Sequence, residues 1–596
     1  MPADTIVARL FEQAAQRPQA PAHYVKRRGA WEAISWRQYA DETRRVAKAL
    51  IALGLEPGGT TAILGFNRPE WVVFDVATMA VGCAPAGIYT TCSSAEIAYI
   101  VGHAGSSVVL VETEEQWERI AAVRERLPEL RHVVMMREAP TIDDDLVMSW
   151  ERLLERGDDI DESELDDRVA SLEMDSLATL IYTSGTTGPP KGVMLSHRNL
   201  AWTSQKVAEV AGVRADDWGL SYLPLSHIAE QLLTIHGPPA TGAAVYFAES
   251  IEKVPDNLRE VQPSVVFGVP RIWEKFHAGV TAKLEEAPKH RRLLVDWVRR
   301  VCTRVNDARN RGESPDLVTR AQYELADRLV LSKLKPRLGL ANARLCVSGA
   351  APIGSDVLEF FSSLDVVIRE VYGQSEDSGP TSLNLPGRTK LGTVGPPLPG
   401  VSVRIAEDGE VLVKGPNVFL GYYKDEAATR EALEDGWLRS GDLGTIDSEG
   451  YLHITGRKKE IIITAGGKNI TPVNIEAALK QSELVGEAVV IGDRRKYLTA
   501  LITLDEEAAA KYREEGVAPH ESEWIRRRMQ STVDEINRDL ARVEQLKRFT
   551  ILPRGFTIED GELTPTMKIK RKVVAEHFAR EIEAMYADDA PARDAG

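Results

Sequence analysis

The most informative segment of the sequence is Tyr182-Thr183-Ser184-Gly185-Thr186-Thr187-Gly188-Pro189-Pro190-Lys191-Gly192. It directly follows residues 177–181, an apolar run with the composition of a buried strand. Glycine permits unusual backbone angles, so successive amide groups can point toward one anion, while hydroxyl groups and a lysine add donors and charge. A flexible surface linker is the competing interpretation, but such linkers rarely follow a buried strand so closely and end in Pro-Pro-Lys-Gly. The segment therefore predicts a phosphate-binding loop whose contacts are Thr183, Ser184, Gly185, Thr186, Thr187 and Lys191.

This loop differs from the Walker A loop of P-loop NTPases. That motif requires a glycine directly before the lysine and a serine or threonine directly after it. Here Lys191 is preceded by Pro190 and followed by Gly192. The pattern excludes a P-loop NTPase and points to another kind of phosphate site.

Length and charge limit the other possibilities. A chain of 596 residues exceeds the usual size of one domain, so at least two domains are expected. Hydrophobic residues make up 43% and charged residues 27%, which is typical of a globular chain. The formal net charge of -16 repels nucleic acid and anionic lipid. We therefore expect no nucleic-acid partner, and any bound phosphate must meet a local site.

The sequence also indicates where the protein works. Its four cysteines have neither CxxC nor metal-ligand spacing, which suits reduced thiols in the cytoplasm. The N-terminus carries Asp4 before Arg9 and has no apolar stretch, so no secretory signal is predicted. Residues 71–89 are the most membrane-like, but Asp75 and Pro85 favour a buried helix followed by a short strand. We predict a cytoplasmic protein and leave a peripheral contact with the membrane open.

The order of expected elements favours an α/β fold. Between residues 34 and 111, helical patterns alternate with short apolar runs, as in sheets covered by helices. Residues 293–305 repeat apolar side chains at helical spacing, which predicts a helical insertion packed on the body of the protein. A membrane-docking role for this insertion is the weaker alternative. After about Gly456 the sequence changes to a smaller α+β unit.

Five further motifs follow the phosphate loop along the chain. They are Ser348-Gly349-Ala350-Ala351-Pro352, Tyr372-Gly373-Gln374-Ser375-Glu376, Ser440-Gly441-Asp442-Leu443-Gly444, Gly456-Arg457-Lys458-Lys459-Glu460 and Thr564-Pro565-Thr566-Met567-Lys568-Ile569-Lys570-Arg571. Together with the loop, and in this order, they closely resemble the adenylate-forming superfamily of acyl-CoA synthetases, peptide-synthetase adenylation domains and luciferases. The resemblance covers nearly the whole chain. It implies a large N-terminal domain of α/β sheets with helices and a β-barrel-like subdomain (residues 1–455), a hinge (456–460) and a small mobile α+β C-terminal domain (461–596).

The resemblance also assigns the nucleotide-binding positions. Besides the phosphate loop, it places around ATP the residues Gly349, Ala350, Ala351, Tyr372, Gly373, Ser375, Asp442 and Arg457. By this resemblance Tyr372 would stack on adenine, and Asp442 and Arg457 would reach the ribose. An aromatic ring offers a flat apolar surface to a purine, and a carboxylate can accept hydrogen bonds from both ribose hydroxyls. Ser375 stands where the family more commonly has threonine, and the hydroxyl that would contact phosphate is kept.

Metal binding and catalysis follow from the same resemblance. Glu376 would hold Mg²⁺, a hard cation that prefers carboxylate and phosphate oxygens. Lys568 would be the catalytic lysine, because a fixed ammonium offsets the negative charge that builds up when a carboxylate attacks the α-phosphate. Lys459 would be the pivot about which the C-terminal domain turns. We interpret its neighbour Lys458 as a solvated surface charge.

Two stretches narrow the class of substrate. Residues 222–230 (YLPLSHIAE) and 267–275 (FGVPRIWEK) resemble long-chain acyl-CoA synthetases, including the bubblegum-type group. The resemblance implies that Phe267, Gly268 and Val269 line the acyl tunnel and that Gly466 lies near the pantetheine path of coenzyme A. It also places His227 as a catalytic residue near the acyl carbonyl. A lone histidine beside leucine and isoleucine is more often a hydrogen-bonded core residue, so this alternative stays open.

These patterns together predict a long-chain fatty acid–CoA ligase. The enzyme would convert fatty acid, ATP and coenzyme A into acyl-CoA, AMP and pyrophosphate through an acyl-adenylate. The nearest alternative is a fatty acyl-AMP ligase that loads an acyl carrier protein, since both share the first half-reaction. A non-catalytic nucleotide or lipid sensor is a third hypothesis, against which the full set of Lys191, Glu376, Asp442 and Lys568 argues. A homodimer is left open.

Overall fold

The core of the large N-terminal domain is an eight-stranded sheet with the strand order β18-β9-β8-β4-β3-β5-β6-β7. The computed structural model describes residues 3–183, 189–512 and 516–587. Six neighbouring strands are parallel, and β9 and β18 join them antiparallel. Their bounds are β3 (Thr60–Leu64), β4 (Ala84–Ile88), β5 (Val108–Val111), β6 (His132–Met135), β7 (Val147–Ser149), β8 (Leu177–Thr183), β9 (Lys191–Ser196) and β18 (Gly421–Tyr422).

Burial on both faces explains the apolar runs of these strands. Every residue of β3, β4 and β5 is buried, as expected for parallel strands between two helical layers. Helix α3 (Pro69–Ala80) begins with its proline, and every residue after that proline is buried. The prediction of a buried helix followed by a short strand within residues 71–89 is therefore confirmed.

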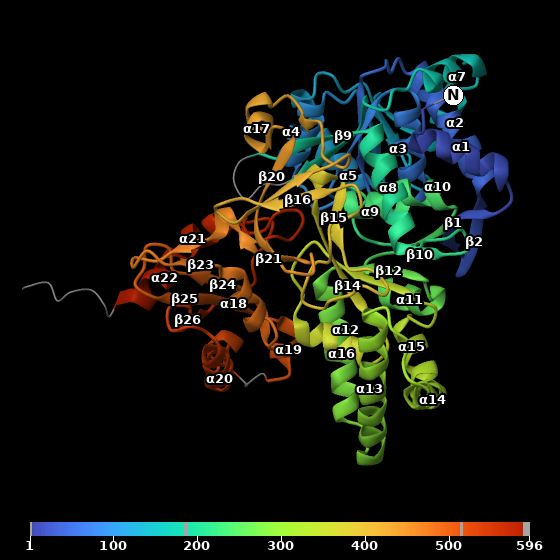
Figure 1. The fold of residues 1–596 in the computed structure, drawn as a ribbon. Helices are drawn as coiled ribbons and strands as arrows, with labels where there is room; N and C mark the ends of the chain where they lie inside the picture. Colours follow the sequence, from blue (N-terminus) through green and yellow to red (C-terminus); the bar gives the residue numbers. More distant parts are fainter. Residues whose placement is uncertain (1–2, 184–188, 513–515, 588–596) are drawn as a thin grey trace, which may run out of the picture.

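Three smaller sheets complete the N-terminal domain (Figure 1). One has the order β10-β11-β1-β2, formed by β10 (Trp218–Ser221), β11 (Ala244–Phe247), β1 (Pro21–Arg27) and β2 (Ala30–Ser35). A second has the order β12-β13-β14-β15, formed by β12 (Val265–Gly268), β13 (Leu345–Ser348), β14 (Ile368–Gln374) and β15 (Gly379–Leu383). The third is an antiparallel sheet of β16 (Ser402–Ile405), β17 (Glu410–Lys414), β20 (Trp437–Ile446), β19 (Leu433–Glu434) and β21 (Leu452–Arg457).

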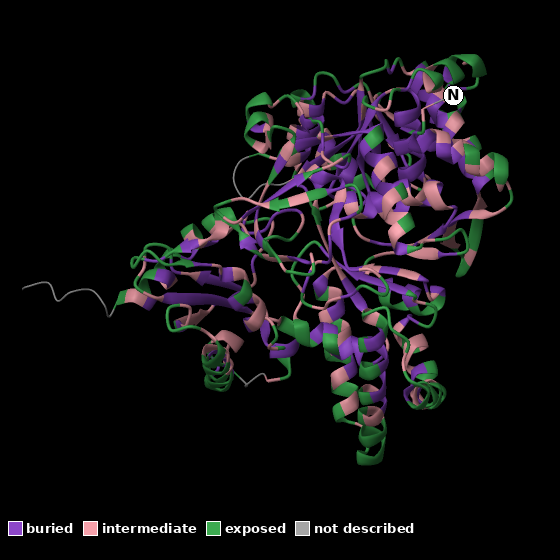
Figure 2. Ribbon diagram, viewed as in Figure 1, coloured by how far each residue is buried: buried purple, intermediate pink, exposed green. Residues whose placement is uncertain are grey.

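The predicted helical insertion is present. Helices α12 (Pro270–Glu285) and α13 (Lys289–Asn310) extend from the body, and the far end of α13 is exposed (Figures 1 and 2). Nearer the body, α13 packs Val298, Val301 and Val305 against α14 (Leu317–Ala326) and the π-helix that follows it (Asp327–Leu331). The described part of the chain contains no helix whose length and hydropathy would let it span a bilayer.

The C-terminal unit has its own apolar cores. Its sheet has the order β24-β25-β26, with β24 (Val485–Ile491), β25 (Leu498–Leu504) and β26 (Leu546–Ile551). Helices α18 (Pro472–Leu479) and α20 (Glu523–Asp539) pack on this sheet, and α21 (Arg571–His577) and α22 (Ala579–Tyr586) belong to a second cluster. The chain thus has the expected architecture of a large α/β domain followed by a smaller α+β domain, which lies beside it in Figure 1.

Candidate functional site

Asp442 and Arg457 face each other across two paired strands. Residue 442 of β20 lies opposite residue 457 of β21, and Nε of Arg457 is 3.1 Å from Oδ1 of Asp442. The other carboxylate oxygen accepts a 2.8 Å hydrogen bond from the phenol of Tyr372. Burial raises the pKa of Asp442, and the charge of Arg457 opposes that rise. Three residues predicted around adenine and ribose are therefore in direct contact.

The backbone of β14 requires glycine beside this tyrosine. A Cβ atom on Gly373 would lie 1.6 Å from the carbonyl oxygen of Gly379 in the neighbouring strand β15. Side chains larger than hydrogen are excluded because the two backbones are in contact here. Directly after the strand, Ser375 is buried and begins a short 3-10 turn that also contains Glu376. Gly373 thus allows β14 to lie close to β15, and Ser375 and Glu376 follow at the end of the strand.

Glu376 is connected to the end of the phosphate loop through a tyrosine. Its Oε1 accepts a 2.9 Å hydrogen bond from the phenol of Tyr422, and the ammonium of Lys191 lies 4.6 Å from the centre of the same ring. Thr183 pairs with Lys191 across β8 and β9, so the two ends of the loop are held together. The loop contacts predicted at Ser184, Gly185, Thr186 and Thr187 lie outside the described residues.

Tyr422 was not among the predicted site residues. It follows Gly421 in the two-residue strand β18, which pairs with β9 directly after the phosphate loop. The aromatic pair at positions 422 and 423 is its only local sequence signal. Its place beside Glu376 depends on a strand pairing across more than two hundred residues, which no local pattern indicates.

The predicted adenine loop lies at the end of β13. An added Cβ on Gly349 would be 2.5 Å from Cγ1 of Val371, so this glycine permits close contact with β14. Ala350 has a φ of 69° and is exposed, as is Ala351. The exposed turn therefore lies against Val371 of β14, the residue directly before Tyr372.

Lys568 comes to this site from the C-terminal domain. The turn at residues 564–568 is closed by hydrogen bonds between Thr564 and Lys568, and the hydroxyl of Thr91 in the N-terminal domain donates to the carbonyl of Pro565 at 2.9 Å. Burial lowers the pKa of Lys568, and so does the charge of Arg457. The carboxylates of Asp442, Glu376 and Glu460 act in the opposite direction. The lysine itself remains exposed to solvent.

His227 lies at the start of the short helix α9 (Ile228–Gln231). Its Nδ1 accepts a hydrogen bond from the backbone amide of Ala229 at 3.1 Å, so the ring caps the helix. Burial lowers the pKa of His227 to about 4, and the charge of Lys568 adds to this effect. The imidazole is therefore neutral at pH 7, and its Nδ1 is already engaged.

Phe267, Gly268 and Val269 lie at the end of β12, next to β13. The phenol of Tyr222 donates to the carbonyl of Phe267 at 2.6 Å, and the indole of Trp273 donates to that of Gly268 at 3.1 Å. An added Cβ on Gly268 would lie 2.9 Å from this indole nitrogen. The segment is thus fixed by two aromatic side chains, and its Phe267 ring lies near the Gly349 turn.

The predicted pantetheine residue is separate from this cluster. Gly466 lies in the exposed turn between β22 (Ile462–Ile463) and β23 (Asn469–Ile470), where an added Cβ would meet only Thr464 Oγ1, at 3.9 Å. The predicted pivot Lys459 is exposed in a 3-10 turn directly after β21.

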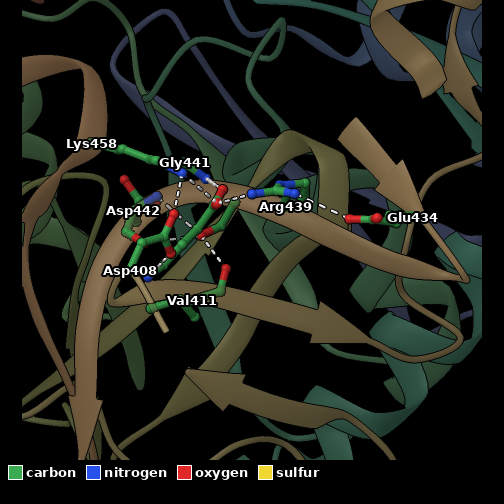
Figure 3. A network of polar contacts seen from close by, with 9 residues as sticks. Asp408, Val411, Glu434, Arg439, Gly441, Asp442 and Lys458 are labelled. Carbon is green, nitrogen blue, oxygen red and sulfur yellow. Dashed lines mark hydrogen bonds and ion pairs between the residues drawn. The ribbon is translucent and has the colours of Figure 1, made fainter. Parts of the chain in front are cut away.

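Lys458 is exposed, as interpreted from the sequence, but it also forms two ion pairs that the local charge run does not indicate. Its ammonium donates to Oδ2 of Asp408 at 2.5 Å and to Oε2 of Glu410 at 3.1 Å, as Figure 3 shows for the surrounding network. The Glu410 side chain is only 4% exposed, so this lysine neutralises a buried carboxylate. The partner acids are distant in sequence and were invisible to an interpretation based on the local charge run.

Two family models match the chain. The model described as "AMP-binding enzyme" matches residues 10–423, and the "AMP-binding enzyme C-terminal domain" matches residues 459–590. The chain is 37% identical to the long-chain-fatty-acid–CoA ligase FadD15 of Mycobacterium tuberculosis, with 98% of this chain and 97% of that protein aligned. It is 36% identical to the long-chain-fatty-acid–CoA ligase ACSBG2 of Xenopus laevis, over 94% of this chain and 80% of that protein.

Solved structures share the fold. The A domain of carboxylic acid reductase from Segniliparus rugosus, in complex with AMP and a co-purified carboxylic acid, matches with a TM-score of 0.74 at 22% identity over 98% of this chain and 94% of that one. ATP-bound MatB from Rhodopseudomonas palustris matches with a TM-score of 0.69 at 24% identity over 97% and 99%. With family models covering most of its length and relatives aligned from end to end, the chain belongs to the AMP-binding enzyme family, as its motifs indicated.

Proposed function

We propose that this protein is an ATP-dependent long-chain fatty acid–CoA ligase. The observation that carries the proposal is the position of Lys568, whose ammonium is subject to the charges of Asp442, Glu376 and Arg457 although it comes from the other domain. A carboxylate substrate and a nucleotide phosphate would both bring negative charge to this place. The relatives named as long-chain-fatty-acid–CoA ligases support the substrate class.

The first half-reaction forms the acyl-adenylate. A fatty carboxylate oxygen attacks the α-phosphorus of ATP, the bond to the β-phosphate oxygen breaks, and pyrophosphate leaves with the negative charge. In this proposal Asp442 and Arg457 hold the ribose, Tyr372 stacks on adenine and Ser375 contacts phosphate. Lys568 stabilises the charge that develops between the carboxylate and the α-phosphate.

The second half-reaction requires a different arrangement. The thiolate of coenzyme A attacks the acyl carbonyl, the bond to the phosphate oxygen breaks and AMP leaves. We propose that the C-terminal domain (461–596) turns about Lys459 in a hinge at residues 456–460, which removes Lys568 from the N-terminal domain (1–455). Support for these boundaries comes from the start of the C-terminal family match at residue 459 and from the separate apolar cores beyond β21. His227 and Gly466 are the candidates to meet the acyl carbonyl and the pantetheine arm.

Glu376 fits a magnesium ion that is shared with the nucleotide. Its Oε1 is oriented by Tyr422, and within the described ranges no cluster of three or more histidine, cysteine, aspartate or glutamate side chains could hold a metal alone. Mg²⁺ typically binds one or two carboxylates and completes its shell with phosphate oxygens and water. When bound, the ion would neutralise phosphate charge. Glu376→Gln should therefore raise the Mg²⁺ concentration needed for half-maximal activity, whereas an unchanged Mg²⁺ dependence would remove Glu376 from this role.

The decisive experiment separates the candidate acceptors. Purified protein is incubated with ATP, Mg²⁺ and palmitate, and exchange of labelled pyrophosphate into ATP is measured before free coenzyme A or a phosphopantetheinylated carrier protein is added. We expect palmitate-dependent exchange and palmitoyl-CoA formation with free coenzyme A. Thioester on the carrier protein alone would instead identify an acyl-AMP ligase, and an absence of exchange would favour a nucleotide or lipid sensor.

A peripheral contact with a lipid surface is a further part of this proposal. What supports it is local: at the exposed end of α13, Leu293 and Leu294 adjoin Arg291 and Arg292, although the net charge of the whole chain, -16, opposes binding to anionic lipid. Exposed leucines beside basic side chains favour an anionic lipid surface. Cosedimentation with phosphatidylglycerol vesicles, lost in Leu293→Ser/Leu294→Ser, would support the contact, and equal recovery of both proteins in the supernatant would contradict it. The homodimer remains a prediction.

A further inference from the structure

Glu410 connects the hinge to the strand that carries Asp442. The glutamate begins β17 and lies opposite Leu443 of β20. Its Oε1 accepts a 3.0 Å hydrogen bond from the backbone amide of Gly441, and its Oε2 accepts from Arg439 at 3.0 Å and from Lys458 at 3.1 Å (Figure 3). One buried carboxylate therefore fixes the residue before Asp442 and the residue after Arg457.

The arrangement produces two adjacent attachments at the end of β21. Arg457 pairs with Asp442, and Lys458 pairs with Glu410 and Asp408. All three acids belong to the N-terminal domain. The next residue differs, because within residues 3–183, 189–512 and 516–587 the Lys459 side chain makes no hydrogen bond or ion pair. The attachment of the hinge to the N-terminal domain thus ends between residues 458 and 459.

We infer that Lys458 and Glu410 form a clamp that holds the stationary side of the hinge and positions Asp442 and Arg457 for the ribose. The inference rests on the proposed function, since it assumes that the C-terminal domain turns at Lys459. A rotation about one residue needs a fixed point directly before it, and two ion pairs to the N-terminal domain provide that point. The same carboxylate accepts a hydrogen bond from the backbone amide of Gly441, whose φ is 72°. It therefore also fixes the backbone conformation directly before Asp442.

The charge balance of the cluster explains why the lysine matters. Asp408, Glu410 and Glu434 face Arg439 and Lys458, so three acids share two bases. Burial raises the pKa of Glu410, but the donors Lys458, Arg439 and Gly441 outweigh it and leave the pKa lowered. Removing Lys458 would leave a buried carboxylate with one base fewer, and its hydrogen bond to Gly441 would adjust. Lys458 and Glu410 are thus positioning residues that act through Asp442 and Arg457.

The test uses Lys458→Met, which keeps the length of the side chain and removes its charge. The matched control is Lys390→Met, because Lys390 is 42% exposed against 41% for Lys458 and also bridges two acids, Asp447 and Glu449, at the opposite end of the β20–β21 hairpin. The affinity for ATP is measured by titration calorimetry without fatty acid. We expect Lys458→Met to weaken ATP binding by about three- to tenfold, because Asp442 and Arg457 are then held less firmly at the ribose position. Lys390→Met should leave the affinity for ATP unchanged. Lys458→Arg should restore most of the affinity.

A second readout follows the hinge itself. Spin labels are attached to cysteines introduced at the exposed positions Glu324 and Glu535, one in each domain, and the distance distribution is recorded with ATP bound. We expect a broader distribution in Lys458→Met than in the unmodified background or in Lys390→Met. Asp408→Asn should broaden it less, because the buried Glu410 still binds the lysine.

Two outcomes are distinguishable from each other. ATP affinity and distance distributions of Lys458→Met that match those of Lys390→Met, with the parent protein active, would overturn the clamp. A parent protein without palmitate-dependent pyrophosphate exchange would overturn the proposed function, whereas calorimetry and distances would still report on the clamp. A fall in thermal midpoint with unchanged ATP affinity and distances would show a purely structural role, which also contradicts the inference.

Discussion

The phenol of Tyr372 donates a 2.8 Å hydrogen bond to Oδ2 of Asp442, whose Oδ1 lies 3.1 Å from Nε of Arg457. The residue proposed to stack on adenine and the pair proposed to bind ribose are therefore one connected unit. An ionised carboxylate accepts hydrogen bonds from ribose hydroxyls more strongly than a protonated one, and the adjacent guanidinium favours the ionised form against the effect of burial, which raises the pKa of Asp442.

Asp442→Asn should weaken ATP binding much more than Tyr372→Phe. The asparagine amide has no ion pair with Arg457, and only one oxygen that can accept hydrogen bonds. KM for ATP should therefore rise by about 10- to 100-fold, corresponding to about 1.5–3 kcal/mol. The phenylalanine keeps the ring for adenine and frees one carboxylate oxygen. Steady-state kinetics with ATP varied at saturating palmitate measure KM for ATP in both variants. An equal rise of KM in the two variants would contradict the assignment of Asp442 to the ribose and of the Tyr372 ring to adenine.

Lys568→Ala should separate the two half-reactions. Adenylate formation should fall by at least about a hundredfold, because the ammonium that offsets the developing charge is lost. Thioester formation from supplied palmitoyl-adenylate and coenzyme A should be largely retained. The control is Lys572→Ala, an exposed lysine four residues further along the chain. Equal loss of both half-reactions in Lys568→Ala would argue against the domain rotation.

Glu230 should make stability depend on pH. This glutamate is 2% exposed, and its carboxyl group accepts hydrogen bonds from the hydroxyls of Ser221 at 2.6 Å and Thr234 at 2.7 Å. Burial raises the pKa of Glu230 from the ordinary value near 4.5 to about 7. Between these values the folded protein keeps a proton that the unfolded chain loses. Its contribution to the free energy of unfolding is thus complete below pH 4.5 and decreases as the pH rises to 7.

Glu230→Gln removes this dependence while keeping an acceptor for both hydroxyls. Relative to the parent protein, the variant should gain roughly 2–3 kcal/mol in free energy of unfolding between pH 5 and pH 7.5. Urea unfolding at both pH values measures the difference. A stability difference that does not change with pH would show that Glu230 ionises normally in the folded state.

Gly373→Ala should destabilise the protein and impair nucleotide binding together. The new methyl group would overlap the Gly379 carbonyl, so β14 and β15 must separate, at a cost of about 1–3 kcal/mol or more. Gly279→Ala is the control, because this helical position in α12 has no atom within 4 Å of an added Cβ. Thermal unfolding should show a lower midpoint for the first variant and an equal or higher one for the second. An unchanged midpoint for Gly373→Ala would contradict the strand contact described here.

The sequence alone determined the family, the fold class and the identity of most candidate site residues. Those inferences rest on short contiguous motifs, in which glycine, hydroxyl and charged residues stand close enough in the chain to define a turn or loop. The buried helix at Pro69–Ala80 and the strand after it were likewise predictable, because burial on all sides leaves an apolar run whose few interruptions mark its ends.

Only the tertiary structure revealed how these motifs support one another. Tyr422 orients Glu376, Glu410 holds Lys458, and Thr91 contacts the turn before Lys568. Each contact joins residues far apart in sequence through strand register or domain docking, which no local pattern specifies. The exposure of Lys458 agrees with its charged run, but its ion pair with the buried Glu410 depends on a residue 48 positions away and is not specified by any local pattern.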